Sequence, residues 1–286
     1  MNSSNSHSLD FCGFPASSDL NHEDWRSLYV RLEQEQAEFL KHEERFRSSE
    51  YRWPRDPLHT WSRMWEYPYV LHHLERIRQE NSGNGTLTAA DIGSGVTFFP
   101  FSVARLGYHV TCNDIDPVCE RDIPAAASLF DHSPGRVTVA LSKGEEIPLP
   151  STTQDVAYCI SVLEHIPDFD TTVSEIARIL KPSGKFILTV DIDLRGDSEL
   201  STGGFELLQI RLAEKFVRAC PERIIHPSLL LTSENSFFPY KHKSTSALLR
   251  GVIRNMLRGQ LIPTKPGVCQ YLAVYGCVLT KVSGDQ

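Results

Sequence analysis

The sequence predicts an α/β fold, in which a mostly parallel sheet is covered by helices on both faces. Short apolar segments of strand length alternate with amphipathic segments of helical period between residues 87 and 219. In addition, the segment 87–95 runs from an apolar stretch into two glycines, Gly93 and Gly95, and then into a helical pattern. A strand, a glycine turn and a helix in this order form the start of a nucleotide-binding βαβ unit, where backbone can approach a ligand closely.

The composition indicates an ordinary globular protein. The 286 residues are 41% hydrophobic and 23% charged, which suits one large domain or one domain with an extension. A net charge of −7 disfavours a general nucleic-acid binder. The seven cysteines form no CxxC pair and several lie in apolar runs, which is typical of reduced thiols in an intracellular protein. No signal peptide or membrane-length apolar run is found, so we expect a soluble, cytoplasmic protein without stable membrane insertion.

The first part of the chain is predicted to be a helical extension. Residues 1–19 are rich in Ser and Asn, and we expect them to form a disordered tail. Apolar residues recur at helical spacing from residue 21, are interrupted near Pro54 and Pro57, and resume in a second helical region. Pro68 there suits a first helical turn. We therefore expect a helical cap over residues 20–83 and a larger domain over 84–286, with an insertion at about 233–268.

The larger domain is predicted to alternate strands and helices. The expected strands are 87–92, 108–114, 136–140, 153–160, 185–190, 229–231 and 271–280. The expected helices are 98–106, 115–130, 171–180 and 205–219, and residues 181–184 are expected to form a turn. Ligands of parallel sheets bind at the carboxyl ends of the strands. The loops after residues 92, 114, 141, 160 and 191 are therefore expected to line one cleft.

Asp114 supports a nucleotide site in this cleft. It ends the second of these strands, about 20 residues after the glycine turn, where a carboxylate can accept hydrogen bonds from both hydroxyls of a ribose. The dinucleotide form of this motif requires a third glycine, and the chain has Phe98 at that position. The pattern thus favours a nucleoside-containing ligand other than a nicotinamide dinucleotide.

Three segments together resemble the class I S-adenosylmethionine (SAM)-dependent methyltransferases of the small-molecule type. They are Asp-Ile-Gly-Ser-Gly at 91–95, Ser-Val-Leu-Glu-His-Ile at 161–166 and Ile-Leu-Lys-Pro-Ser-Gly at 179–184. Their order and spacing agree with the family from about 86 to 281, where the closing apolar strand also fits. The resemblance implies a Rossmann-like, doubly wound, seven-stranded sheet with an antiparallel last strand. It also implies SAM as the cofactor and S-adenosylhomocysteine (SAH) as the product.

The resemblance also implies which residues hold SAM. The candidates are Asp91, Gly93, Ser94, Gly95, Asp114, Ile115, Lys143, Gly144, Ser161 and Tyr67. Residues 91–95 would surround the methionine end, Asp114 would hold the ribose, and Ile115 would flank the adenine. Lys143 and Gly144 fall where the family often has an acid that accepts from the adenine amine, and Lys143 cannot accept. Tyr67 belongs to the cap, whose helices often cover the cleft in this family, or it simply packs against its aromatic neighbours.

Two candidate catalytic residues follow the fourth and fifth strands. His165 has a side chain whose ordinary pKa lies near neutrality, so it is either a general base or a packing residue. Asp191, with Asp193 after it, either accepts a proton, binds a cationic amine or is a solvated strand end. Some relatives, including ubiquinone-pathway O-methyltransferases and small-RNA 2′-O-methyltransferases, bind a divalent metal through E-x-x-E-H. Ser161 replaces the first acid here, so no metal is predicted.

The segment from 236 to 268 contains no acid but several cations. They are Lys241, Lys243, Arg250, Arg254, Arg258 and Lys265. This stretch either attracts an anionic acceptor or a membrane surface, or it is a solvated helix face. We therefore predict a SAM-dependent methyltransferase acting on oxygen or nitrogen of a small-molecule acceptor. The alternatives are a non-catalytic SAM-fold binding or scaffold protein and a nucleic-acid methyltransferase. The net charge and the lack of an Asn/Asp-Pro-Pro-Tyr-type motif disfavour the latter.

Overall fold

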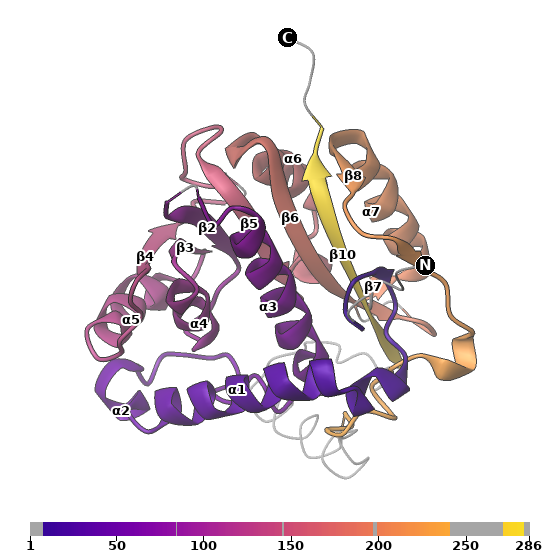
Figure 1. The fold of residues 1–286 in the computed structure, drawn as a ribbon, viewed down its shortest axis with the longest axis horizontal. Coiled ribbons are helices and arrows are strands. Elements are labelled where there is room, and N and C mark those ends of the chain that lie inside the picture. The colour runs from indigo at the N-terminus through magenta and orange to yellow at the C-terminus, as the bar shows by residue number, and fades with distance from the viewer. Residues whose placement is uncertain (1–7, 84, 145, 197–198, 241–270, 283–286) are drawn as a thin grey trace, which may run out of the picture.

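The computed structural model describes residues 8–83, 85–144, 146–196, 199–240 and 271–282. Within these ranges, ten strands form a single sheet in the order β4-β3-β2-β5-β6-β10-β1-β9, with β7 beside β6 and β8 beside β10 (Figure 1). Helices cover both faces of this sheet, so the predicted α/β fold is confirmed. The basic residues between 241 and 265, and most of the predicted insertion, lie outside the described residues.

Five parallel strands form the centre of the sheet. They are β2 (Leu87–Ile92), β3 (Tyr108–Asp114), β4 (Arg136–Leu141), β5 (Gln154–Ile160) and β6 (Leu180–Asp193). The final strand, β10 (Leu272–Lys281), runs antiparallel to β6, as the family resemblance implies. The helices between these strands are α4 (Phe99–Arg105), α5 (Pro117–Ala127), α6 (Phe169–Ile179) and α7 (Thr202–Lys215), with the short 3₁₀ helix η2 (Leu163–His165) after β5.

The expectation of seven strands requires a correction, because short pairings extend the sheet. The additional strands are β1 (Cys12–Gly13), β7 (Leu200–Ser201), β8 (Phe216–Arg218) and β9 (Glu222–Arg223). With β8, which pairs antiparallel with β10, the long strands make up the implied seven. β1 and β9 add to the edge of β10, and β7 pairs with the end of β6.

Three local assignments from the sequence are also wrong. Residues 216–218, predicted as helix, form β8, because Phe216 is buried and this segment pairs with β10. Residues 229–231 form no strand; the 3₁₀ helix η3 (Pro227–Leu229) ends there, and the His226 side chain caps it by accepting from the Ser228 N–H. Residues 181–184, predicted as a turn, lie within β6 at a register shift against β5.

The two faces of the sheet bury two separate apolar cores, because successive strand residues point in opposite directions. Ala89 and Val156 belong to the core under α3, α4 and α5, whereas Ala90 and Ala157 belong to the core under α6 and α7. Figure 1 shows α3 in front of the sheet and α6 behind it. Both faces of each central strand are therefore apolar, as expected for a doubly wound sheet.

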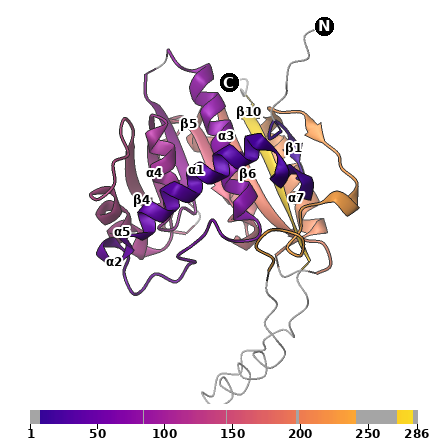
Figure 2. The same cartoon turned by 60° about the horizontal axis from the view of Figure 1, so that its bottom comes forward.

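The predicted cap consists of α1 (Glu23–Leu40), α2 (Glu43–Phe46) and α3 (Arg63–Glu80). α1 crosses in front of α3 and α4 (Figure 2), and its Phe39 ring lies 5.6 Å from Phe101 and 5.0 Å from Phe130. Pro68 lies inside α3 rather than in its first turn. Proline has no N–H to donate to the carbonyl of Met64, four residues earlier. That carbonyl instead accepts from the Trp25 indole of α1 at 2.9 Å, which joins the two helices.

Residues 8–19 are packed against the domain, which corrects the expectation of a disordered tail over 1–19. Leu9 and Cys12 are fully buried, and η1 (Ser17–Asn21) leads into α1. The Tyr69 hydroxyl donates to the Phe11 carbonyl at 2.7 Å, so α3 satisfies the backbone of this segment. The Ser- and Asn-rich composition is strongest in residues 1–7, which lie outside the described residues. Among the helices that are described, none combines the length and the apolar character needed to cross a membrane.

Candidate functional site

A cleft of about 1160 Å³ opens at the carboxyl ends of the parallel strands. Residues at the carboxyl ends of β2, β3, β4, β5 and β6 form its floor, the cap loop 47–62 forms one wall, and the segment 232–240 contributes another. Pockets for a single small ligand usually measure roughly 300–1,000 Å³. This cleft therefore has room for a cofactor and a second molecule side by side.

The glycine turn after β2 is held by the neighbouring strand. The N–H groups of Gly93 and Ser94 both donate to the Asn113 carbonyl, at 2.8 and 3.2 Å. Gly93 has a φ of 71°, and a Cβ atom there would lie 2.5 Å from the Val162 side chain. Glycine is therefore required for close packing in a left-handed conformation. The paired amides of Gly93 and Ser94 are not free donors for a ligand, contrary to the usual role of such a turn.

Asp114 connects this turn to the end of β3. Its Oδ2 atom accepts from the Gly95 N–H at 2.8 Å, and its Oδ1 atom accepts from the Asp116 N–H at 2.9 Å. An ionised carboxylate has about four acceptor positions, so two remain. Asp114 also lines the cleft. The carboxylate is thus held in place by backbone and still able to accept hydrogen bonds from two hydroxyl groups.

The predicted cofactor-contacting residues line this cleft, with one exception. The residues that line it are Asp91, Gly93, Ser94, Gly95, Asp114, Ile115, Gly144, Ser161 and Tyr67. Lys143 is exposed and does not line the cleft, whereas its neighbours Ser142 and Gly144 do. Tyr67 stacks on Phe99 with ring centroids 4.6 Å apart, so it packs against an aromatic neighbour and borders the cavity at once.

A buried ionic group joins the cap to the floor of the cleft. The carboxylate of Glu66, on α3, is 0% exposed and accepts from the Ser161 hydroxyl at 2.6 Å and from the Arg63 guanidinium at 2.7 Å. Ser161 has a φ of 45°, a left-handed conformation that non-glycine residues rarely adopt. Glu66 therefore supplies a carboxylate beside Ser161, which stands where some relatives have the first acid of E-x-x-E-H. The burial of Glu66 also supports pairing, because an unpaired buried charge is costly.

Two further carboxyl groups lie next to this ion pair. The Glu164 carboxylate accepts from the Asp191 N–H at 2.9 Å, and the Ser62 hydroxyl donates to Asp191 Oδ2 at 3.4 Å. Burial raises the pKa of Glu164 to about 7, and burial with the nearby charge of Glu66 raises the pKa of Asp191 well above its ordinary value. One atom of each group, Glu164 Oε2 and Asp191 Oδ1, is buried without a hydrogen-bond partner. This part of the floor can therefore take up or release a proton near neutral pH.

His165 and Asp193 differ in their relation to the cleft. His165 lines it, and its Nδ1 atom lies 3.1 Å from Glu199 Oε2. The hydrogen bond to Glu199 raises the pKa of His165 above its ordinary value. Asp193, expected beside Asp191 at the acceptor side, does not line the cleft, and its carboxylate instead accepts from the Arg195 N–H at 3.0 Å.

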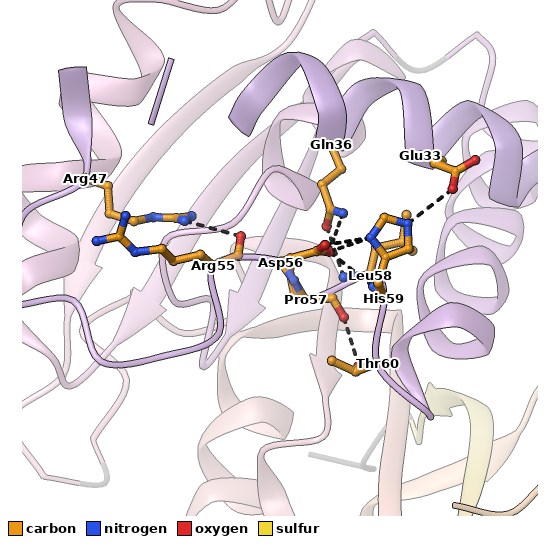
Figure 3. Close-up of polar contacts among 9 residues, drawn as sticks. All are labelled: Glu33, Gln36, Arg47, Arg55, Asp56, Pro57, Leu58, His59 and Thr60. Atoms are coloured by element: carbon orange, nitrogen blue, oxygen red, sulfur yellow. Dashed lines mark hydrogen bonds and ion pairs between the residues drawn. The ribbon is translucent and has the colours of Figure 1, made fainter. Parts of the chain in front are cut away.

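The cap loop 47–62 is fastened to α1 (Figure 3) and, through Arg47, to the residue that follows the glycine turn. Gln36 of α1 donates to Asp56 at 2.7 Å and accepts from the Leu58 N–H at 3.0 Å. His59 lies between Asp56 and Glu33, whose carboxylates help to raise its pKa against the opposing effect of burial. Arg47 donates to the carbonyl of Val96 at 2.8 Å. The wall formed by this loop is thus tied to both the cap and the core.

The segment 232–240 meets the cap loop across the cleft. Its Ser233 N–H donates to the Leu272 carbonyl of β10 at 2.9 Å, and the Phe238 ring lies edge-on to His59 at 5.1 Å. The sequence pattern did not assign these wall residues to a site. It marked Arg63 and Glu66 as part of a charged cluster and Glu164 as part of an incomplete metal motif, without a site role, and it did not point to Glu199. The density of aromatic residues between 51 and 69 was the available signal for the cap wall.

Known proteins share this framework. A family model described as "Methyltransferase domain" matches residues 90–188. The mitochondrial ubiquinone biosynthesis O-methyltransferase of Schizosaccharomyces pombe is 31% identical over 68% of this chain and 67% of its own length. The sterol 4-C-methyltransferase strm-1 of Caenorhabditis elegans is 34% identical, but the match spans 34% of this chain and only 29% of that protein. The crystal structure of the [4+2]-cyclase SpnF, 15% identical, has a TM-score of 0.51 and aligns with 96% of this chain and 100% of that one, a likeness of fold. The chain belongs to the class I SAM-dependent methyltransferases.

Proposed function

We propose that this protein transfers the methyl group of SAM to an oxygen or nitrogen atom of a small-molecule acceptor. The observation that supports it best is that the cleft spans four neighbouring strands. The glycine turn and Asp114, at β2 and β3, form its first end, and His165 and Asp191, after β5 and in β6, form its second end. Oxygen is the favoured acceptor atom, because the relative from Schizosaccharomyces pombe is named as an O-methyltransferase.

The residues of the first end fit SAM. Asp114 would accept from the ribose hydroxyls with the acceptor positions that Gly95 and Asp116 leave free. Arg63 lines the cleft, and one of its nitrogens pairs with Glu66, so the rest of the guanidinium would hold the methionine carboxylate. Ile115 would pack against the adenine. When bound, SAM supplies a methyl group that is already activated on a positively charged sulfur.

The residues of the second end would position the acceptor and take its proton. Asp191 would receive the proton of the acceptor group, because burial next to Glu164 and Glu66 already raises its affinity for protons. Glu164 would stabilise Asp191 by holding its backbone N–H, and Ser62 would orient its carboxylate. His165, oriented by Glu199, is a second candidate for holding the acceptor hydroxyl. The cap loop would exclude water from this region.

Transfer of tritiated methyl groups from SAM into a small-molecule extract, followed by fractionation of the labelled product, tests the proposal. We expect label in a small molecule with the wild-type protein. Asp191→Asn should lower transfer by roughly 100-fold or more, since general bases contribute about 10²–10⁴-fold, while SAH affinity stays unchanged. Asp114→Ala should instead act mainly on SAH affinity. Loss of hydrogen bonds to a charged acceptor, roughly 1.5–3 kcal/mol, should weaken SAH binding about 10- to 100-fold.

Three outcomes would contradict this proposal. Labelled nucleic acid or protein in place of a small molecule would assign the chain a different acceptor class. SAH binding with no label in any fraction would favour the non-catalytic alternative. An Asp114→Ala protein that binds SAH like the wild type would refute the assignment of the ribose site.

A further inference from the structure

Aromatic side chains at the mouth of the cleft remain exposed on two opposing walls. Trp53, on the cap loop, is 54% exposed, and Phe237, on the segment 232–240, is 55% exposed. Both line the same cleft. Exposed apolar side chains that gather around a concave site usually mark a surface for an apolar ligand. Neither residue belongs to the two apolar cores of the sheet. A bound apolar ligand would explain why both lie at the mouth of this cleft.

The lining of the cleft combines polar and apolar side chains. Asp191 provides a carboxyl group at the end where the acceptor group would react. Trp61, Ile166 and Phe238 add apolar surface to the same lining. A ligand that extends from Asp191 to the exposed Trp53 and Phe237 therefore meets a polar group at one end and apolar surface along the rest of its length.

The walls at the mouth are joined on one edge rather than free to separate. His59 of the cap loop contacts Phe238 across the cleft, with ring centroids 5.1 Å apart, and Phe237 lies edge-on to Trp25 of α1 at 5.9 Å. The segment that carries Phe237 is thus joined both to the cap loop that carries Trp53 and to α1. A small polar acceptor confined to the floor would leave Trp53 and Phe237 in water, whereas an apolar group that reaches the mouth covers both.

We propose that the acceptor is amphiphilic, with the methylated hydroxyl or amine on the floor and an apolar chain or ring system that runs outward between Trp53 and Phe237. This inference rests on the proposed function, because that function assigns the accepting group to the floor. Trp53 and Phe237 are specificity-determining residues and do not touch the reacting atoms. They come from two segments that lie outside the strands and helices of the shared fold.

Binding of two homologous series tests the inference. 4-n-Alkylcatechols and 4-n-alkylanilines, from methyl to octyl, are titrated calorimetrically into the SAH-saturated protein. For the wild type we expect Kd to fall roughly three- to fourfold with each added methylene, the value for full burial of the chain. In Trp53→Ala/Phe237→Ala, the decrease should shrink to less than about 1.5-fold per methylene, while the methyl compounds bind as before. Ile224→Ala, at an exposed apolar residue off the cleft, is the matched control and should leave both series unchanged.

The inference is overturned if wild-type affinity does not depend on chain length, if the double variant keeps the dependence, or if no member of either series binds. Unchanged SAH affinity and thermal midpoint in the double variant establish that its fold and cofactor site are intact. Methyl transfer to these compounds is measured separately with tritiated SAM. Chain-length-dependent binding without transfer to any compound supports the inference and contradicts the proposed function. Methyl transfer to these compounds without chain-length-dependent binding supports the proposed function and contradicts the inference.

Discussion

The Glu164 carboxyl group is not part of the Arg63–Glu66 ion pair. It accepts from the Asp191 N–H, and the nearby charge of Glu66 opposes its ionisation. Burial therefore favours the protonated form of Glu164 and raises its pKa from 4.5 to about 7. The folded protein thus binds a proton more tightly at this site than the unfolded chain does.

We predict that Glu164 makes the stability of the unliganded protein decrease as pH rises. A group whose pKa is raised in the folded state stabilises it fully below the unfolded pKa, here 4.5, and this contribution is lost as pH rises towards about 7. Glu164→Gln keeps an acceptor oxygen for the Asp191 N–H but cannot ionise. Relative to this variant, the wild-type thermal midpoint should fall across that pH window. Parallel curves would contradict the prediction, and Glu206→Gln, at an exposed position, is the control.

The residues that line the cleft illustrate what the sequence could predict of the site. Gly93 and Asp114 follow short strands directly, so the pattern of a strand and the residues after it was sufficient to place them. The contacts of Glu66 with Ser161 and of His165 with Glu199 join residues far apart in the sequence. No local pattern encodes such contacts, because they depend on how α3 and the loop before β7 dock on the sheet.

At the scale of elements, the cap loop 47–62 shapes the cleft although it contains almost no regular structure. It is fixed by side chains such as that of Arg47, of which 1% is exposed. The guanidinium bonds to Val96, Glu43 and the Arg55 carbonyl, and lies 4.7 Å from the Tyr51 ring centroid. The sequence showed this loop only as a break near Pro54 and Pro57, because its anchors lie in α1 and in the glycine turn.

We predict that Arg47→Ala both destabilises the protein and weakens cofactor binding. The change leaves Glu43 and two carbonyl groups without this partner, and loss of hydrogen bonds to a buried charge should lower the free energy of unfolding by roughly 2–4 kcal/mol. SAH affinity should fall as well, because Val96 follows the glycine turn directly. Urea unfolding and calorimetric titration measure the two effects.

Arg45→Ala, at an exposed position two residues away in α2, is the matched control for Arg47 and should change neither quantity. An Arg47→Ala protein with lowered stability but wild-type SAH affinity would mean that the loop does not support the cofactor end of the cleft. Unchanged stability would mean that the anchor itself is unimportant.

At the scale of the whole molecule, the cap is part of the main core rather than a separate lid. Phe39 of α1 packs with Phe101 and Phe130, and Trp25 bonds to the carbonyl that Pro68 leaves without a donor. The alternation of strands and helices was sufficient to predict the α/β class and the parallel order. The packing of residues 8–19 was not predictable, because their backbone is satisfied by distant side chains such as Tyr69.

We propose that the cap, residues 20–83, and the domain that follows unfold as one unit. All four tryptophans, at positions 25, 53, 61 and 65, lie in the cap, so tryptophan fluorescence reports on it, while far-ultraviolet circular dichroism reports on the whole chain. The two urea transitions should coincide. Phe39→Ala, a buried deletion that costs roughly 3–5 kcal/mol, should shift both curves together. A fluorescence transition at lower urea concentration than the circular dichroism transition would show that the cap unfolds separately.

The position of β10 has a consequence for synthesis of the protein. β10 leaves the ribosome after every other strand that the structure describes, yet it lies inside the sheet between β6 and β1. A translation product that stops before Leu272 lacks every backbone partner of the outer side of β6. It would present a long, apolar, unpaired strand edge, which is a template for aggregation. Premature termination between β9 and β10 should therefore yield material for chaperones and proteases rather than a shortened enzyme.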